Sequence, residues 1–384
     1  MENIIDLAKK EFYWLHQHPE LSGQEYKTTA RLKDFLERHG IIVEDLALST
    51  GLVAEVKGLQ EGPTIAIRCD IDALPVQEQT ELEYKSIYPG CMHACGHDFH
   101  AATLLGIALA LQKQPPLRGK VKLVFQPAEE NLNGAQQIIA SGALTDVDAI
   151  FGLHCSAAYP VGTIICSAGA MHGAVDNFHI AFNGVGAHAC RPQQAVEPIL
   201  MLSNYIMTIQ GLVSRGKQPF NPAVLSITHV QAGSCNNIIP DSGFLEGTLR
   251  TVYKEDRVSI KQRMEGWAQQ IAAGYGGSAE ITWDQGLPAT NNQAVWVDLA
   301  KAVAQKLGLP MVPAPNSLAG EDFAFYQEKL SGAFIQIGTG VGPMQHNPCF
   351  AVNPQTFAAS IPFGYELALA ALAQLEQQGG VGND

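Results

Sequence analysis

The order of strand-like and helix-like segments restricts the fold of this chain more than any other feature of its sequence. In the first part of the chain, short β-rich runs alternate with helical patterns, which is typical of a parallel sheet covered by helices on both faces. The middle part departs from this alternation and follows the order β-α-β-β-α-β, which is typical of a ferredoxin-like unit. After Pro288 the mixture of helix and strand resumes. We therefore expect one unit inserted into another.

The expected elements follow from the spacing of apolar residues and from the turn residues between them. In the first part we expect helices at 2–18, 25–39 and 98–112 and strands at 52–56, 64–69, 121–125 and 149–153. In the middle part we expect strands at 178–182, 223–230, 243–251 and 279–283 and helices at 196–213 and 254–273. The last part predicts helices at 294–307 and 354–375 around a strand at 334–337. The tail at 377–384 is expected to fray.

This order predicts an α/β protein with a discontinuous first domain. Residues 1–175 and 290–384 are expected to form this first domain around a mostly parallel sheet. Residues 176–289 are expected to form the inserted ferredoxin-like domain. The length of 384 residues also favours two domains, because an ordinary domain has ~100–200 residues.

The composition limits the class of partner. The formal net charge is −13 and no Lys/Arg-rich cluster occurs, so neither nucleic acid nor an anionic membrane is expected to bind. The N-terminus lacks a basic segment before an apolar one, and no run of about 20 apolar residues occurs, which predicts a cytoplasmic protein. Eight scattered cysteines do not indicate a disulfide framework. A small molecule is therefore the expected ligand.

The densest group of potential metal ligands lies at residues 91–100, directly before the expected helix at 98–112. The segment reads Cys-Met-His-Ala-Cys-Gly-His-Asp-Phe-His. A structural zinc site needs four ligands at paired spacings, and no Cys-x2-Cys partner follows. An open catalytic site therefore fits this segment better than a closed structural one.

Two adjacent carboxylates, Glu129 and Glu130, follow the expected strand at 121–125. Ligand crevices in α/β sheets lie at this end of the strands. Adjacent side chains point in different directions, so one carboxylate can bind a metal while its neighbour serves as a general base. The alternative is that both belong to a solvated loop or to the first turn of a helix at 132–140, where Glu is favoured.

Other polar side chains follow other strands of the same expected sheet. His154 follows the strand at 149–153, Asp70 and Asp72 follow the strand at 64–69, and His346 lies on a Gly-rich loop. Each of them alone is more typical of a turn or a rim. Since the carboxyl ends of parallel strands meet at one edge of a sheet, their coincidence indicates a shared site.

Seven strings of residues together resemble the M20 family of metallopeptidases. They are Arg68-Cys-Asp-Ile-Asp-Ala-Leu-Pro, Met92-His-Ala-Cys-Gly-His-Asp, Gln126-Pro-Ala-Glu-Glu, Gly186-Ala-His-Ala-Cys-Arg-Pro, Asn237-Ile-Ile-Pro, Gly247-Thr-Leu-Arg-Thr and Ala319-Gly-Glu-Asp-Phe. Within that family they resemble amidohydrolases of N-acyl amino acids, such as hippurate hydrolases, auxin-conjugate hydrolases and N-acetyldiaminopimelate deacetylases. The resemblance covers nearly the whole chain.

The resemblance implies a site with two divalent metal ions and with Glu129 as general base. The implied ligands are Cys91, His93, Glu130, His154 and His346, whereas Cys95 is expected to pack into the start of the helix. Zn²⁺ or Mn²⁺ is the expected metal, and Co²⁺ or Ni²⁺ also suits these ligands. Asp70 matches an acidic position that is assigned as catalytic in the family, and Asp72 is a rival for that role.

The resemblance also implies how a substrate binds. The guanidinium of Arg250 suits a substrate carboxylate, and Asn237 is expected to contact the substrate as well. His188 is expected to reach across a dimer interface and donate a hydrogen bond to the oxyanion of the reaction. The discontinuous first domain is therefore expected to be the catalytic, metal-binding one, and the inserted domain is expected to act as a lid and to form a homodimer.

The expected reaction is hydrolysis of N-acetyl or aryl-acyl amino acids to a carboxylate and a free amino acid. A dipeptidase or aminopeptidase of the same family is the first alternative. A non-catalytic metal-binding or ligand-binding protein is the second, and it is disfavoured because Glu129 and all five implied ligands are present.

Overall fold

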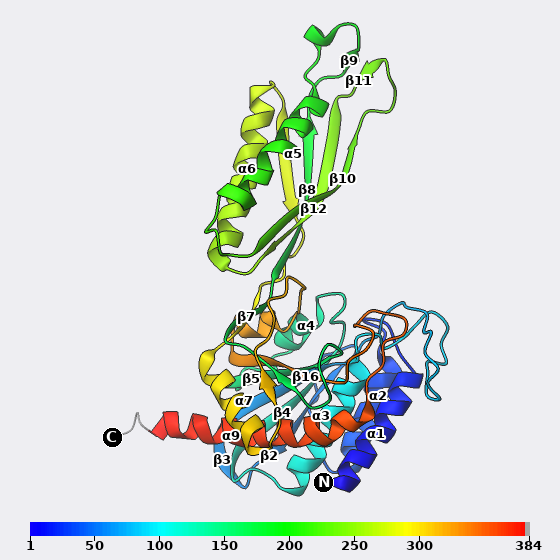
Figure 1. Ribbon diagram of the computed structural model, residues 1–384, viewed down its shortest axis with the longest axis vertical. Coiled ribbons are helices and arrows are strands. Elements are labelled where there is room, and N and C mark those ends of the chain that lie inside the picture. The colour runs from blue at the N-terminus through cyan, green and yellow to red at the C-terminus, as the bar shows by residue number, and fades with distance from the viewer. Residues whose placement is uncertain (381–384) are drawn as a thin grey trace. The chain divides into compact units, whose positions relative to one another are not determined.

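The computed structural model describes residues 1–380 and groups them into two units (Figure 1). Unit 1 comprises Met1–Met171, Asn291–Pro315 and the chain from Asp322 onward, and unit 2 comprises His172–Thr290 and Asn316–Glu321. Residues 316–321 were expected in the first domain. They belong to unit 2 because the N–H of Gly173 donates to the carbonyl of Ala319 (3.1 Å). The assignment of the units as catalytic domain and lid stays a prediction.

Unit 1 contains an eight-stranded mixed sheet. Its strands are β1 (Ile42–Val43), β2 (Leu52–Lys57), β3 (Gln60–Asp70), β4 (Arg118–Gln126), β5 (Ala149–Ser156), β6 (Ile164–Ile165), β15 (Met311–Val312) and β16 (Ser331–Gly338). They lie in the order β1-β2-β4-β3-β5-β16-β6-β15. The central strands β4, β3, β5 and β16 are parallel, as predicted. The sheet becomes antiparallel toward its edges, at β1-β2-β4 and at β16-β6.

The helices of unit 1 are α1 (Glu2–Gln17), α2 (Tyr26–Arg38), α3 (His97–Lys113), α4 (Gly134–Ala140), α7 (Ala294–Lys306), α8 (Ala324–Gln327) and α9 (Phe357–Gly380), with a 3-10 turn at Pro354–Thr356. α3 and α9 pack against β3 and against each other, and α1 packs against α3. Every residue of α3 from His97 to Leu111 is buried, as is typical of a helix enclosed on all sides. Residues 377–380, where fraying was expected, continue α9, whereas 381–384 lie outside the described residues.

Within residues 1–380, α9 is the one helix long and apolar enough to cross a membrane by length and composition. Its apolar window is 56% buried within the protein, as in the core helix of a globular domain.

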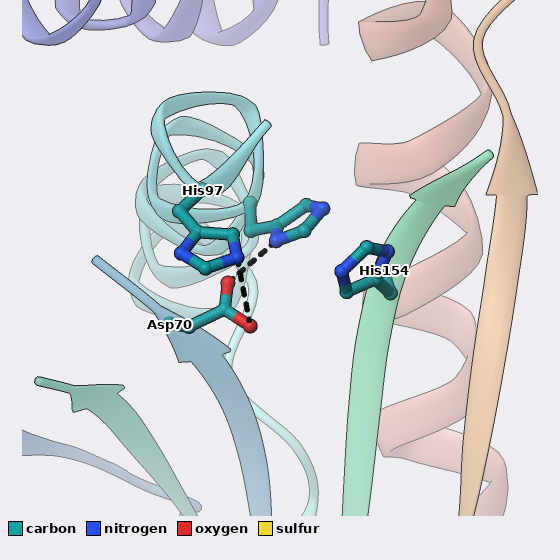
Figure 2. Close-up of side chains that lie close together, drawn as sticks. Asp70, His97 and His154 are labelled. Carbon is teal, nitrogen blue, oxygen red and sulfur yellow. Dashed lines mark hydrogen bonds and ion pairs between the residues drawn. The ribbon is translucent and has the colours of Figure 1, made fainter. Parts of the chain in front are cut away.

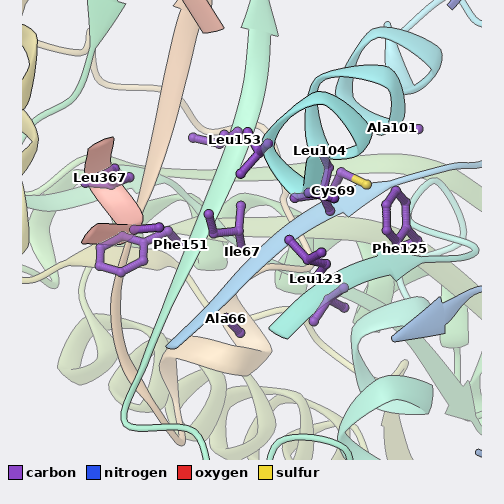
Figure 3. Packing of buried hydrophobic residues seen from close by; sticks show 14 of the residues in the cluster. Ala66, Ile67, Cys69, Ala101, Leu104, Leu123, Phe125, Phe151, Leu153 and Leu367 are labelled. Carbon is purple, nitrogen blue, oxygen red and sulfur yellow. The ribbon is translucent and has the colours of Figure 1, made fainter. Parts of the chain in front are cut away.

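The apolar core of unit 1 lies between the central strands and the helices that cover them. Figure 3 shows Ile67 of β3, Leu104 of α3, Leu123 of β4 and Phe151 of β5 converging there. Burying one such side chain stabilises the fold by about 1.5–3 kcal/mol. The packing therefore holds the parallel strands in one register and aligns their carboxyl ends.

Unit 2 contains a four-stranded antiparallel sheet with two helices. Its elements are β8 (Ala174–Asn183), α5 (Pro198–Arg215), β10 (Ala223–Ala232), β12 (Ser242–Thr251), α6 (Lys254–Gly274) and β13 (Ser278–Trp283), which follow the predicted β-α-β-β-α-β order. The sheet order is β10-β12-β8-β13. α5 and α6 pack against this sheet and against each other. Two short strands, β9 (Ala187–His188) and β11 (Ile238–Ile239), form a separate pair, and β7 (Gly169–His172) pairs with β14 (Thr290–Asn292).

Candidate active site

The carboxyl ends of three parallel strands place polar side chains in one row. Asp70, the last residue of β3, pairs with Gln126, the last residue of β4. On the other side of β3, Arg68 pairs with Gly152 of β5, so His154 lies two residues further along and level with Asp70. This is the edge of an α/β sheet at which ligand sites occur.

The first turn of α3 adds histidines to this row. Gly96, directly before the helix, has a left-handed backbone with a φ of 85°. A Cβ there would lie 2.6 Å from the Sγ of Cys155, so the turn requires glycine. The helix begins at His97. The Nε2 of His97 lies 3.7 Å from the Oδ2 of Asp70. Figure 2 shows His97 beside Asp70, with His154 facing them from the neighbouring strand.

Both ring nitrogens of His100 are already occupied by protein groups. Its Nε2 accepts the N–H of Cys155 (2.7 Å), so its Nδ1 carries the proton and donates to the Oδ1 of Asp70 (2.5 Å). Burial lowers the pKa of His100 to about 3 in spite of the nearby charge of Asp70. The neutral ring therefore ties α3 to β3 and β5, and it offers no lone pair to a ligand.

The structure distinguishes the two aspartates after β3. The Oδ1 of Asp72 lies 3.1 Å from the Nδ1 of His97, and its Oδ2 accepts the N–H of Glu130 (3.0 Å). The carboxylate of Asp70 is instead shared between His100 and the guanidinium of Arg68 (2.8 Å). Asp72 is thus the aspartate that fixes the tautomer of His97, with the Nε2 lone pair directed away from it.

Glu130 and His97 contribute two buried polar atoms that face each other. The Oε1 of Glu130 lies 3.8 Å from the Nε2 of His97. Both atoms are buried and neither makes a hydrogen bond of normal geometry among the described residues, although His346 approaches the oxygen of Glu130 to 3.4 Å. Buried polar atoms are rarely left unpaired, so a cation bound between a carboxylate oxygen and an imidazole lone pair suits this pair.

The turn that carries the two glutamates is tight. Ala128 has a left-handed backbone with a φ of 50°, and α4 begins only at Gly134. Glu129 and Glu130 therefore lie in the loop before the helix, and not in its first turn. Glu129 is buried, and one of its oxygens lies within 4.8 Å of ligand atoms of His97 and Glu130.

Two further residues complete the group around Glu130. Cys95, Glu130 and His346 hold ligand atoms within 4.8 Å of one another. The Nε2 of His346 lies 3.4 Å from the Oε1 of Glu130, which raises the pKa of His346. The Sγ of Cys95 lies 3.7 Å from the Nε2 of His154. Three of the predicted ligands, Glu130, His154 and His346, thus lie in groups suited to a metal ion.

The structure does not bring Cys91 and His93, which were predicted to be ligands, into any such group among residues 1–380. The thiol of Cys91 is directed to the carbonyl of Pro19 (3.6 Å), and burial raises its pKa to about 11. His93 is enclosed in the protein, and burial lowers its pKa to about 4. Cys95 and His97 lie in such groups instead, and the Gly between them was the local signal of the tight turn at the helix start.

Arg68 is a buried part of the site that local sequence patterns do not reveal. Its side chain is fully buried and donates to Asp70 (2.8 Å), to Gln126 (2.7 Å) and to Asp322 (2.7 Å). Asp322 in turn accepts hydrogen bonds from the amide of Gln126. The guanidinium of Arg68 forms an ion pair with Asp70, and the pKa of Asp70 is held well below its usual range although burial opposes this. Asp70 is therefore an anion that supports its neighbours.

The three residues expected to bind substrate lie in unit 2. His188 lies on β9, and its Nδ1 accepts the N–H of Cys190 (3.1 Å), so its proton lies on Nε2. The carbonyl of Asn237 accepts the N–H of Ala189 (3.0 Å). Arg250 lies on β12, and burial lowers its pKa.

These residues occupy two ends of unit 2. The β9–β11 pair follows the end of β8 that is aligned with Ser242, whereas Arg250 pairs with Val175 at the other end of β8. At about 3.4 Å per residue, roughly 27 Å of β12 separates Ser242 from Arg250. Unit 2 brings His188 and Asn237 together and leaves Arg250 apart.

This chain is similar to known proteins over nearly its whole length. The sequence model of peptidase family M20/M25/M40 matches residues 66–374. An N-acetylcysteine deacetylase of Bacillus subtilis is 43% identical over 94% of this chain and 96% of its own length. An IAA-amino acid hydrolase of Arabidopsis thaliana is 35% identical over 97% of this chain and 89% of its own. The crystal structure of a Bacillus subtilis dinuclear metal binding peptidase of the M20 family superimposes with a TM-score of 0.88 at 40% identity, covering 97% of this chain and 99% of the other.

Proposed function

Because the chain belongs to peptidase family M20/M25/M40, we propose that it is a metal-dependent amidohydrolase that cleaves N-acyl amino acids to a carboxylate and a free amino acid. The observation that carries this proposal is the facing pair formed by the Oε1 of Glu130 and the Nε2 of His97, both buried and without a hydrogen bond of normal geometry in the described structure. The relatives that act on an N-acetylated or an IAA-conjugated amino acid support the substrate class.

The residues that would hold two divalent metal ions are three histidines, one carboxylate and one thiol, namely His97, His154, His346, Glu130 and Cys95. This set has the composition expected from the sequence, with Cys95 and His97 in place of Cys91 and His93. Its mixture of nitrogen, oxygen and sulfur ligands suits Zn²⁺ and tolerates Mn²⁺, Co²⁺ or Ni²⁺. When bound, such ions polarise an amide carbonyl and make a water molecule more acidic.

Glu129 is the residue we assign as general base. It lies next to Glu130, and the two carboxylates have separate roles, since Glu130 binds metal and Glu129 handles the proton. Glu129 takes a proton from the attacking water and returns it to the nitrogen of the leaving amine. Asp72 keeps the proton of His97 on Nδ1, and the Nε2 lone pair stays available.

Arg250 is the group we assign to the carboxylate of the substrate. Asp176, whose charge acts on Arg250, is buried and already binds the guanidinium of Arg257 (2.7 and 2.9 Å) and the ammonium of Lys261 (2.9 Å). Within residues 1–380, Arg250 itself makes no hydrogen bond through its side chain, so its planar donors remain available to a carboxylate.

His188 is the donor we assign to the developing oxyanion, and it acts from a second copy of the chain. Its protonated Nε2 is a suitable donor, but His188 and Arg250 lie at opposite ends of unit 2. One substrate therefore meets Arg250 of one chain and His188 of another in a homodimer formed through unit 2. Asn237, beside His188, belongs to the same end.

A substrate screen tests the proposed function. Metal-loaded protein is assayed with ninhydrin against N-acetyl, benzoyl and indole-acetyl amino acids, with free dipeptides as the comparison set. We expect release of the amino acid from the N-acyl set, loss of activity after chelation, and recovery on adding Zn²⁺ or Mn²⁺. Faster cleavage of dipeptides would identify a dipeptidase, and no cleavage of either set would contradict an amidohydrolase.

A further inference from the structure

The loop between α1 and α2, residues 18–25, contacts both segments that carry the site. Leu21 forms a parallel bridge with Ala73, and the carbonyl of Glu20 accepts the N–H of Ala73 (2.8 Å). These bonds fix the loop against the chain that follows β3. Two side chains of the loop, Ser22 and Glu25, then extend to groups of the site.

Ser22 reaches the aspartate that orients His97. Its hydroxyl donates to the Oδ2 of Asp72 (2.6 Å), while the Oδ1 of the same carboxylate faces the Nδ1 of His97. The Oδ2 also accepts the N–H of Glu130. Asp72 thus connects Ser22 to two of the proposed metal ligands, to the ring of His97 and to the backbone N–H of Glu130.

Glu25 reaches the turn that presents Glu129. Its Oε1 accepts the N–H of Ala128 (2.8 Å) and that of Gly23 (2.8 Å), and the residue is fully buried. The left-handed backbone of Ala128 is unfavourable for a residue with a side chain and persists only where its surroundings enforce it. The carboxylate of Glu25 supplies such a constraint directly before Glu129.

We propose that Ser22 and Glu25 are positioning residues for hydrolysis, Ser22 by holding Asp72 toward His97 and Glu25 by holding the turn at Ala128 that presents Glu129. This inference rests on the proposed function, to which it adds two residues that touch neither metal nor substrate. It follows that Ser22 acts mainly on metal affinity and Glu25 mainly on turnover.

Glu25 is tested with the variants Glu25→Gln and Glu25→Ala. The amide oxygen of Gln still accepts both N–H groups, so Glu25→Gln should keep kcat and the hydrogen-exchange protection of the peptide that contains Ala128. Glu25→Ala should lose that protection and about 10–100-fold in kcat, as is typical for an outer partner of a metal site, while KM changes little.

The matched control for Glu25 is Glu11→Ala. Glu11 is another buried carboxylate of the same region, and it accepts two hydrogen bonds from Arg31 (2.8 and 3.0 Å). Its loss should destabilise the fold without changing kcat or exchange at Ala128. Equal losses of kcat in Glu11→Ala and Glu25→Ala, or unchanged exchange in Glu25→Ala, would overturn the role of Glu25.

Ser22 is tested by the affinity of Ser22→Ala for Zn²⁺ in chelator-buffered titrations. We expect affinity to fall by about 10-fold, the lower end of the effect of removing a group bonded to a ligand, because Ser22 acts on the ligand His97 through Asp72. Ser141→Ala, which removes a 2.7 Å bond to the carbonyl of Ile138 at the end of α4, is the control and should leave affinity unchanged. An affinity for Ser22→Ala equal to that of the control would overturn the role of Ser22. If wild-type protein binds metal but cleaves no N-acyl amino acid, the proposed function fails. The Zn²⁺ titration then still tests the role of Ser22, and hydrogen exchange at Ala128 still tests the role of Glu25.

Discussion

Two Cys-x-His segments lie four residues apart in this chain, and they have opposite environments. In the outer segment, Cys91 contacts a backbone carbonyl and His93 is enclosed in the protein. In the inner segment, Cys95 and His97 lie among the ligand atoms of the proposed metal site. The residue types and the spacing are the same, so neither explains the difference.

What separates the two segments is their position relative to the start of α3. The inner segment surrounds Gly96, whose left-handed backbone turns the chain into the helix above the strand ends. The outer segment is fixed earlier, where Met92 exchanges two backbone hydrogen bonds with Leu74 (both 3.0 Å). The strand ends and the start of α3 therefore decide which pair lies among the grouped ligand atoms, and four experiments test this comparison.

Replacing His97 should have the largest effect. His97→Asn should lose bound metal and reduce turnover by more than the ~10–100-fold that loss of an outer partner costs, because it removes a ligand itself. His93→Asn should retain both metal and turnover. Metal content by mass spectrometry and the steady-state rate check this, and metal loss in His93→Asn with retention in His97→Asn would reverse the comparison.

Replacing Glu129 separates proton transfer from metal binding within the inner region. Glu129→Gln keeps the shape of the side chain but loses its basicity, so turnover should fall by ~10²–10⁴-fold while metal content stays at the wild-type level. Rate and metal content are measured on the same sample. A variant that loses its metals would make Glu129 a ligand, and one that keeps its rate would exclude it as the base.

Cobalt substitution distinguishes the two cysteines. A thiolate bound to Co²⁺ gives a charge-transfer band in the near ultraviolet, and we expect this band in wild type and in Cys91→Ser. Cys95→Ser should lose the band and bind Co²⁺ more weakly, since a hydroxyl is a poorer ligand than a thiolate. If the band disappeared with Cys91 instead, the outer segment would hold the metal.

The surroundings of the outer segment should influence stability rather than metal binding. His16, near His93, lies between Asp98 (2.6 Å) and Glu78 (3.2 Å). Burial alone would lower its pKa, but these two carboxylates raise it from 6.5 to about 9. Because this pKa is higher in the folded protein, protonated His16 stabilises the folded state by about 3 kcal/mol. This contribution is complete below pH 6.5 and is lost as pH rises through about 9.

The measurement compares wild type with His16→Gln. The difference between them in free energy of unfolding, from urea titrations, should be largest near pH 6 and should shrink toward about pH 10. Metal affinity should be the same in both proteins. A difference in stability that is independent of pH would show that His16 is not charged in the folded protein.

The order of secondary structure was predictable because it depends on local patterns. Apolar spacing identified β3, β4 and β5 and therefore the sheet edge at which Glu130, His154 and Asp70 meet. The short strands β9 and β11 were not predicted, since two-residue strands leave no periodic signal. The antiparallel edges of the sheet depend on tertiary pairing and were not predicted either.

The hydrogen-bond partners of the site residues were harder to predict from the sequence. Glu25 and Ala128 are 103 residues apart, and Arg68 and Asp322 are 254 apart, so no local pattern connects them. The sequence alone also did not show that Cys95 and His97, rather than Cys91 and His93, lie among the grouped ligand atoms. This depends on where the chain turns into α3, which is set by the close approach of Gly96 to Cys155.

Val175 and Leu287, near the two ends of the chain segment that forms most of unit 2, exchange backbone hydrogen bonds of 2.9 and 2.8 Å. To the rest of the polypeptide, this long segment is therefore equivalent to a short loop whose ends already touch, and it adds little closure entropy to the folding of unit 1. Such a segment can be removed or exchanged without preventing the rest of the chain from folding. Unit 1 with a short glycine-rich linker in place of residues 174–288 should still fold. The excised segment is suited to exchange with the corresponding segment of another family member.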